Sequence, residues 1–266
     1  MPPPDSHLQL TDEERTTLKT WIEAGAEWCN TPKEATAGSS FVFSIVGYPS
    51  DVEEVLLGPD GALVGAEPGT TLVEMTTSEP MLAQRIHAEA AAKGVHSLDA
   101  PVSGGDLGAQ NASLAIMVGG DREAFEAALP LLQVLGGNVA HFGPAGAGQR
   151  VKMSNQILIA STMIGVVESL LYATRSGLDM NEVIDLIGSG AAGCWSINNL
   201  GRRIAKEDYA PGFFIKHFVK DMGIALRDAS ALGLELPGLT LAKEFYDRSM
   251  EAGLENDGTQ ALYKIL

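Results

Sequence analysis

Cysteine is scarce in this sequence, with only Cys29 and Cys194 among 266 residues. The two residues are far apart, and no Cys/His spacing typical of a metal site accompanies them. These absences exclude a disulfide framework and the common zinc-site patterns. Two small buried thiols in a reducing compartment are the simplest interpretation, so we expect a cytoplasmic protein without a bound metal.

Basic residues are also few, since 18 Lys and Arg accompany 34 Asp and Glu, which gives a formal net charge of -16. Such a chain repels phosphate backbones and anionic lipid surfaces, so we expect no nucleic-acid or membrane partner. The longest apolar run, at 157–167, is too short to span a bilayer, and the first residues do not show the pattern of a secretory signal. An anionic ligand must therefore be held by local cations and backbone amides.

The order of apolar patterns predicts two domains, which suits the length of the chain. Between residues 41 and 142 short apolar runs alternate with helical patterns, which predicts a largely parallel sheet covered by helices, with ligands at the carboxyl ends of the strands. After residue 148 only helical patterns follow. We expect strands at 41–46, 71–75, 95–100, 113–118 and 139–142, and helices at 11–25, 31–38, 51–57, 80–93, 121–135, 151–176, 180–188, 196–206, 218–232 and 239–252.

The first stretch with chemical content is Asp99-Ala-Pro-Val-Ser-Gly-Gly105, which follows a predicted strand. Its proline and paired glycines force a turn whose N–H groups can converge on an anion, and the Ser103 hydroxyl adds a donor. A carboxylate held there would be oriented by several hydrogen bonds. A simple turn is the alternative, and these residues alone favour it.

The second stretch is Gly146-Ala-Gly-Gln-Arg-Val-Lys-Met-Ser-Asn155, at the start of the long apolar helix. Lys152 and Asn155 are three residues apart and share one helix face. Burial would lower the pKa of the lysine below its ordinary value of ~10.4, which suits proton transfer near neutral pH. A solvated lysine at a helix end is the alternative.

The third stretch, Lys220-Asp-Met-Gly-Ile-Ala225, opens another apolar helix. Lys216 and His217 lie just before it, and Phe213-Phe214 come shortly before them. A local charge cluster is ordinarily a solvated surface. Because aromatic residues are interleaved here, a wall of a ligand cleft is about equally plausible.

In this order, the three stretches resemble the β-hydroxyacid dehydrogenase family, of the 3-hydroxyisobutyrate dehydrogenase and tartronate semialdehyde reductase type. The resemblance runs from about Ala24 to Leu266 and includes Gly47-Tyr-Pro-Ser-Asp-Val-Glu-Glu54 and Gly190-Ala-Ala-Gly-Cys-Trp-Ser196. It implies an α/β fold class, with a truncated Rossmann-like parallel-sheet domain followed by an all-α domain joined through a long helix. It also implies an oxidoreductase that uses NAD or NADP and acts on a small carboxylate substrate, assembled as a homo-oligomer through its helical domain.

The resemblance assigns roles to individual residues. Lys152 matches the family's catalytic lysine, which exchanges a proton with the substrate oxygen, and Asn155 matches the amide that fixes the substrate against it. The turn that would hold the substrate carboxylate comprises Ser103, Gly104 and Gly105. The positions that match cofactor contacts are Tyr48, Pro49, Thr77 and Lys220.

A Gly-x-Gly-x-x-Gly phosphate loop, with which the family's fold begins, is absent from residues 1–24. Residues 1–8 and 18–28 instead resemble the tail of a planctomycete-type cytochrome c domain, without its Cys-x-x-Cys-His haem attachment. We therefore predict an N-terminal arm and helix at 1–28, a residual dinucleotide-binding domain at 29–147 and a helical substrate and dimerisation domain at 148–266. Without the first strand of the fold, we expect an unpaired strand edge and weakened dinucleotide binding.

Two functions follow as hypotheses. The first is hydride transfer between a nicotinamide cofactor and a small β-hydroxy acid or its semialdehyde. The alternative is a non-catalytic remnant whose helical lobe still associates, as an oligomerising or interaction protein, and a haem-associated fusion is a third, weaker possibility. The sequence leaves open the exact hydroxy acid, the choice between NAD and NADP, and the size of the oligomer.

Overall fold

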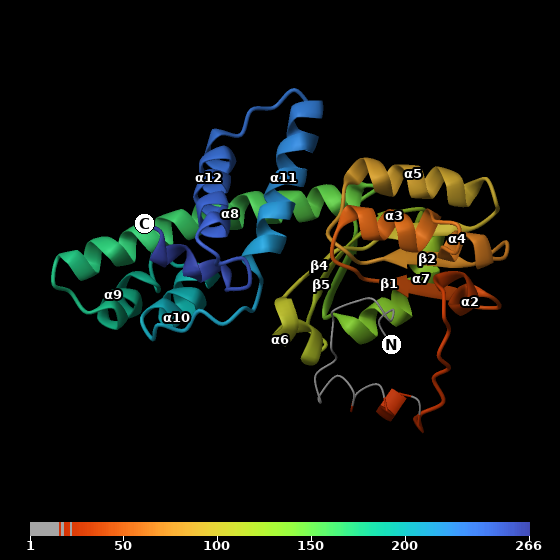
Figure 1. Ribbon diagram of the computed structural model, residues 1–266, viewed down its shortest axis with the longest axis horizontal. Coiled ribbons are helices and arrows are strands. Elements are labelled where there is room, and N and C mark those ends of the chain that lie inside the picture. Colours follow the sequence, from red (N-terminus) through yellow and green to blue (C-terminus); the bar gives the residue numbers. More distant parts are fainter. Residues whose placement is uncertain (1–15, 17–18, 22) are drawn as a thin grey trace.

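The computed structural model describes residues 16, 19–21 and 23–266, and it arranges them as a sheet lobe and a helical lobe joined by one long helix (Figure 1). The sheet lobe contains, in chain order, α2 (Pro32–Thr36), β1 (Phe41–Ser44), α3 (Pro49–Leu57), α4 (Ala62–Gly65), β2 (Thr71–Glu74), α5 (Pro80–Ala91), β3 (His96–Asp99), β4 (Val102–Ser103), α6 (Gly105–Gln110), β5 (Ala115–Gly120), α7 (Arg122–Leu135) and β6 (Asn138–His141). The helical lobe contains α8 (Ala147–Arg175), α9 (Met180–Ile187), the π-helical turn η1 (Ile197–Gly201), α10 (Arg202–Ile204), α11 (Ile215–Ala231), α12 (Pro237–Glu251) and the 3-10 turn η2 (Thr259–Lys264). The predicted fold class, an α/β lobe followed by an all-helical one, is confirmed.

The sheet is largely parallel, as predicted, since three of the five strand pairings among the described residues are parallel, but β5 adds two antiparallel pairings that the sequence did not predict. Strands β1, β2 and β3 are parallel, but β5 runs antiparallel to both β3 and β4, and β6 is parallel to β5. A parallel pairing needs a crossover that returns the chain to its starting edge. Only the short helix α6 and a turn through Ala112 lie between β4 and β5, so the chain reverses there, whereas the 14-residue helix α7 makes a full crossover between β5 and β6.

Local signals in the sequence locate most elements but not all of their ends. Helix α2 begins as predicted, with Pro32 at its first position and the Thr31 hydroxyl accepting a hydrogen bond from the Glu34 N–H. The predicted helix at 196–206 is instead split into η1 and α10, and α4, β4 and α6 are additional to the prediction. Of the predicted helix at 11–25, the described residues Thr16, Lys19–Trp21 and Glu23 are helical, and Ala24 and Gly25 form a turn. The other residues of this prediction, with the arm before it, lie outside the described residues.

Three apolar clusters form the cores of the two lobes, two in the sheet lobe and one in the helical lobe. Alternate residues of the sheet enter opposite faces: Leu72 packs with α3 and α5, while its neighbour Val73 packs with α7. The third cluster is the core of the helical lobe, and it includes Met163 from α8, Phe218 from α11 and Tyr246 from α12. Helix α8 is long and apolar enough to cross a membrane by those two criteria alone. Since α11 and α12 pack against it, we interpret α8 as the central helix of this core.

The outer edge of β1 has no strand partner within the described residues. All four residues of β2 are buried, whereas Phe43 of β1 is 40% exposed and the following Ile45 is 66% exposed. An unpaired edge with apolar side chains beside it can accept another strand. The outer side of β1 is therefore an unprotected edge of the sheet.

Candidate active site

Asp99, at the carboxyl end of β3, receives the N-terminus of α8. Its Oδ1 accepts a hydrogen bond from the Gly146 N–H and its Oδ2 accepts one from the Gln149 N–H, each at 2.8 Å. A carboxylate at this position also stabilises the positive end of the helix dipole. The helix approaches so closely that a Cβ on Gly148 would lie 2.6 Å from the Asp99 carbonyl oxygen. The two sequence stretches that contain these residues thus build one joint between the lobes.

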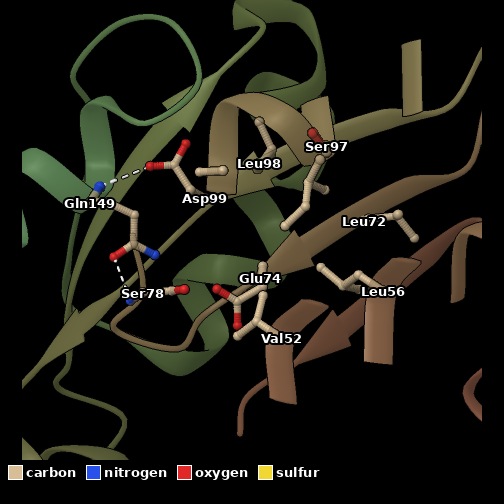
Figure 2. A pocket seen from close by; sticks show the side chains of 11 residues that line it. Val52, Leu56, Leu72, Glu74, Ser78, Ser97, Leu98, Asp99 and Gln149 are labelled. Atoms are coloured by element: carbon tan, nitrogen blue, oxygen red, sulfur yellow. Dashed lines mark hydrogen bonds between the residues drawn. The ribbon is translucent and has the colours of Figure 1, made fainter. Parts of the chain in front are cut away.

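Gln149 connects α8 to the loop after β2, through a side chain that is fully buried (Figure 2). Its Oε1 accepts a hydrogen bond from the Ser78 N–H at 2.9 Å, and its Nε2 donates one to the Thr76 carbonyl at 2.8 Å. The cavity beside it has a volume of about 10 Å³, which is room for about one water molecule. This cavity is a packing void inside the sheet lobe and is too small for a substrate.

Lys152 lies one helical turn after Gln149 and is only 6% exposed. Its charge interacts with Asp221 and Lys220, both on α11. Burial lowers the pKa of the Lys152 amine below its ordinary value, and the positive charge of Lys220 lowers it further, while Asp221 acts in the opposite direction. Lys152 is therefore an amine from which a proton can be removed more easily than from a solvated lysine.

Asp221 is the anion at the centre of this cluster and is 1% exposed. Its Oδ1 lies 3.2 Å from the Lys220 Nζ, and its Oδ2 accepts a hydrogen bond from the Gln156 Nε2 at 2.6 Å. Burial raises the pKa of this carboxyl, although Lys220 and Lys152 both favour its charged form. The Asn155 Nδ2 donates to the Gln156 Oε1 at 2.7 Å, so Asn155 reaches Asp221 through Gln156.

Lys220 spans the two lobes from α11. Its Nζ donates hydrogen bonds to the carbonyl oxygens of Thr77, at 2.7 Å, and of Gly47, at 3.1 Å. It also lies 6.0 Å from the centroid of the Tyr48 ring, within reach of a cation–π contact. One ammonium therefore binds the carboxyl-end loops of both β1 and β2.

The start of α3 forms the outer side of this region. Tyr48 is 40% exposed, and its ring lies 5.5 Å from that of His217 on α11. Pro49 occupies the first helical position and has no N–H, while the Tyr48 N–H donates to the Asp51 Oδ2 at 2.9 Å. The pKa of His217 is lowered by burial and by the nearby Lys220 and Lys216 charges.

Ser103 ends β4, Gly104 is the N-cap of α6 and Gly105 is the first residue of that helix, so these residues form a tight connection between strand and helix. Both glycines adopt positive φ angles, +134° and +64°, which favour glycine. The turn faces the helical lobe, because a Cβ on Gly105 would lie 3.3 Å from the Gly212 carbonyl oxygen. In the described part of the chain, no hydrogen bond or ion pair joins this turn to Lys152. The other predicted site residues, in contrast, are gathered around α8, α11 and the loops after β1 and β2.

Known families match nearly the whole chain. Residues 5–143 match the NAD-binding domain of 6-phosphogluconate dehydrogenase, and residues 146–266 match a domain described as the NAD-binding of NADP-dependent 3-hydroxyisobutyrate dehydrogenase. The chain belongs to the β-hydroxyacid dehydrogenase family. This confirms the resemblance stated from the sequence and makes the chain a member of a family of NAD(P)-dependent oxidoreductases, with NAD or NADP as its cofactor.

Individual relatives agree with this assignment. An uncharacterized oxidoreductase of Bacillus subtilis is 51% identical over 244 residues, which are 92% of this chain and 85% of the relative. A probable mitochondrial 3-hydroxyisobutyrate dehydrogenase-like protein of Arabidopsis thaliana is 50% identical, over 93% of this chain and 74% of the relative. The crystal structure of a 3-hydroxyisobutyrate dehydrogenase from Salmonella typhimurium is similar with a TM-score of 0.86 and 27% identity, over 97% of this chain and 90% of that structure.

The described residues of this dehydrogenase-family chain fit one half of a nicotinamide dinucleotide better than the other. The loops after β1 and β2 place the exposed Tyr48 ring beside the hydrogen bond between Lys220 and Thr77, which suits the packing of a planar ring against them. A pyrophosphate instead needs a helix N-terminus with free N–H groups. The N-termini of α3 and α8 already hold the carboxylates of Asp51 and Asp99. The residues present therefore fit the nicotinamide half.

Several residues of this region were not singled out from the sequence. Gln149, Gln156 and Asp221 carry its hydrogen bonds, although Gln149 and Asp221 lie inside stretches that the sequence had marked. Two buried carboxyls of the sheet lobe were also missed: burial raises the pKa of Glu74 to about 7 and that of Asp99 to about 6. Their strand positions gave no sign of this, since it depends on what packs around them.

Proposed function

We propose that this chain transfers a hydride between NAD or NADP and a small β-hydroxy acid or the corresponding semialdehyde, in the manner of 3-hydroxyisobutyrate dehydrogenase. The observation that carries the proposal is the buried Lys152 amine, which faces Asp221 and Lys220 where the two lobes meet. Membership of the dehydrogenase family and the similarity to proteins named for 3-hydroxyisobutyrate support the substrate class.

The bound nicotinamide would supply the hydride in reduction and accept it in oxidation. Lys152 moves the proton: its Nζ–H donates to the substrate carbonyl oxygen as that oxygen becomes a hydroxyl, and the neutral amine takes the hydroxyl proton in the reverse direction. Because the pKa of Lys152 is lowered, the pH at which its charged and neutral forms are equally populated lies closer to neutral. The charge of Asp221 limits that lowering and so keeps the protonated form available.

The other site residues have binding roles in this proposal. The N–H groups and hydroxyl of the turn at Ser103, Gly104 and Gly105 hold the substrate carboxylate, and Asn155 orients the substrate against Lys152. The cofactor contacts are made by Tyr48, Pro49, Thr77 and Lys220. The exposed Tyr48 ring and the interlobe hydrogen bonds of Lys220 support this assignment.

Substitution of Lys152 tests the mechanism. Lys152→Ala should lower turnover of 3-hydroxyisobutyrate and of tartronate semialdehyde by at least ~100-fold, the usual contribution of a general acid or base. The affinity for NADH or NADPH, measured by fluorescence titration, should stay unchanged. Lys206→Ala removes an exposed lysine and serves as the control. Turnover that survives in Lys152→Ala would remove the assigned role.

The second candidate function is a non-catalytic protein that associates through its helical lobe. The open edge of β1 and the carboxylates at the N-termini of α3 and α8 favour it, because both features weaken a dinucleotide grip. Titration of the 266-residue chain with NADH and with NADPH separates the two candidates. Saturable binding in the micromolar range supports the dehydrogenase, and a folded chain that binds neither nucleotide supports the alternative.

We also propose a homo-oligomer formed through the helical lobe. Leu158 and Tyr172 on α8 and Leu186 on α9 are apolar and are 69%, 75% and 78% exposed. Covering such side chains stabilises an interface. The mass in solution, measured by light scattering after size-exclusion chromatography, should exceed that of one chain and should fall in Leu186→Asp. The free thiols of Cys29 and Cys194 agree with the cytoplasmic location proposed for the protein.

A further inference from the structure

The contacts of Gln149 join three parts of the molecule at one buried residue. Its backbone N–H donates to the Asp99 carboxylate at the end of β3. Its side chain binds both the Thr76 carbonyl and the Ser78 N–H in the loop after β2. Figure 2 shows Gln149 between Asp99 and Ser78, with its amide directed into the loop. A side chain with both a donor and an acceptor is needed to make the two loop contacts.

The peptide groups that Gln149 binds lie on either side of Thr77. Thr76 and Ser78 are each held by Gln149, while the Thr77 carbonyl accepts the hydrogen bond from Lys220. The Thr76 N–H also donates to the Glu74 Oε1, at 2.8 Å. The direction in which Thr77 presents its carbonyl to Lys220 is therefore set by contacts made on both of its flanks.

Gln149 also lies three residues before Lys152 on the same helix, so the two side chains share one face. The backbone N–H of Gln149 donates to Asp99, so this turn of α8 cannot move relative to β3 without breaking a buried hydrogen bond. Gln149 thus sets the spacing between the turn that carries Lys152 and the loop that carries Thr77. A shift of about 1 Å at such a spacing costs roughly 100-fold in rate for reactions that depend on alignment.

We propose that Gln149 is a positioning residue for the nicotinamide side of the site: it holds the 76–78 loop so that Thr77 and Lys220 bind the cofactor at a fixed distance from Lys152. This inference rests on the proposed dehydrogenase function. In this proposal Gln149 contacts neither substrate nor cofactor. Lys152 moves the proton, and Gln149 fixes the position of the nicotinamide that carries the hydride.

Gln149→Leu, Gln149→Glu and the unsubstituted chain test the proposal by fluorescence titration with NADH and NADPH and by kinetics. Gln149→Leu should raise the Kd and the KM for the nucleotide by about tenfold, because the Thr76 carbonyl and the Ser78 N–H lose their partners. The pH dependence of kcat should be unchanged, since the charges that act on Lys152, those of Asp221 and Lys220, remain in place. Hydrogen exchange at the Ser78 amide should become faster.

Gln149→Glu is the second variant, and it serves if Gln149→Leu does not fold. A glutamate preserves the shape of the side chain and the acceptor for the Ser78 N–H. The substituted carboxyl can donate to the Thr76 carbonyl only when it is protonated. Nucleotide affinity in Gln149→Glu should therefore be weak at high pH and recover as the pH falls, whereas the unsubstituted chain should not show this recovery.

Gln260→Leu is the matched control. Gln260 is equally buried, and its Nε2 donates to the carbonyl oxygens of Asp208 and Ala210 in the helical lobe. The same chemical change there should lower the melting temperature and leave the nucleotide Kd unchanged. Equal Kd values in Gln149→Leu, Gln149→Glu and the unsubstituted chain would overturn the positioning role alone. Absence of nucleotide binding in the unsubstituted chain would overturn the proposed function itself.

Discussion

The Lys220 Nζ lies 2.7 Å from the carbonyl oxygen of Thr77, although 143 residues separate them in the sequence. The contact joins α11 of the helical lobe to the loop after β2 in the sheet lobe. The same ammonium pairs with the buried Asp221 carboxylate. One side chain thus neutralises a buried charge and fixes the two lobes to each other.

Lys220→Met should be strongly destabilising, because it removes the cation 3.2 Å from the buried Asp221 carboxylate together with the hydrogen bonds to Thr77 and Gly47. Removal of one partner of a buried pair costs about 3–5 kcal/mol. Lys243→Met, which breaks the partly exposed pair with Asp247 one helical turn away, should cost only about 0.3–0.5 kcal/mol. Urea unfolding of both variants measures the difference. Equal losses would show that the Lys220 contacts are not a buried pair in solution.

Asp221→Asn should move the pH dependence of the reaction toward lower pH. The negative charge of Asp221 raises the pKa of Lys152, so its removal lets that pKa fall further. In the proposed mechanism, reduction of the semialdehyde requires protonated Lys152, so the alkaline limb of the kcat/KM profile should shift to lower pH. Asp247→Asn is the control and should leave the limb in place, because Asp247 on α12 pairs with Lys243 and does not act on the pKa of Lys152. A shift to higher pH would contradict the assignment of Lys152.

Glu74→Gln should flatten the dependence of stability on pH. Burial raises the pKa of Glu74 from 4.5 to about 7, so the folded protein holds this proton more tightly than the unfolded chain does. Such a group stabilises the fold below pH ~4.5, and this stabilisation is lost as the pH rises toward 7, a change of roughly 3 kcal/mol. Thermal melting between these pH values measures the slope. Exposed Glu123→Gln should keep the slope of the unsubstituted chain.

Gly148→Ala should disrupt the joint between β3 and α8. A methyl group there would collide with the backbone carbonyl oxygens of Met117 and Asp99, neither of which can move without shifting a strand. Gly165→Ala provides a control on the same helix, because nothing lies within 4 Å of its Cβ position, and it should stabilise the protein by about 0.5–1 kcal/mol. Chemical denaturation of the two variants should give shifts of opposite sign. A stable Gly148→Ala protein would mean that the lobes pack less closely than described.

The sequence predicts this fold well where a pattern is local. Strand and helix positions follow from apolar periodicity, and Thr31-Pro32 marks the start of α2 correctly. The direction of β5 could not be predicted in this way, because it depends on whether the segment after Asp99 crosses the sheet or reverses. A six-residue helix and a turn look like an ordinary connection in the sequence, and only their packing shows that they reverse the chain.

The same distinction between local and long-range features applies to the candidate site. Short motifs mark Lys152 and Lys220 as candidates in the sequence, and both lie where the lobes meet. Gln149 and Gln156 resemble ordinary helix residues, since their partners come from elements 65 to 73 residues away. Asp99 lay inside a marked stretch, yet its contact is with the helix that follows almost 50 residues later rather than with a ligand. Long-range hydrogen bonds of this kind leave no periodic trace.

The exposed Phe43 and Ile45 beside the open edge of β1 also affect the tendency of the protein to aggregate. Two copies that meet edge to edge would gain backbone hydrogen bonds and cover these side chains, which makes the strand a template for aggregation. The net charge of -16 opposes such encounters by mutual repulsion, and dissolved salt screens that repulsion. Preparations are therefore expected to remain clear longest at low ionic strength and to turn turbid as salt is added.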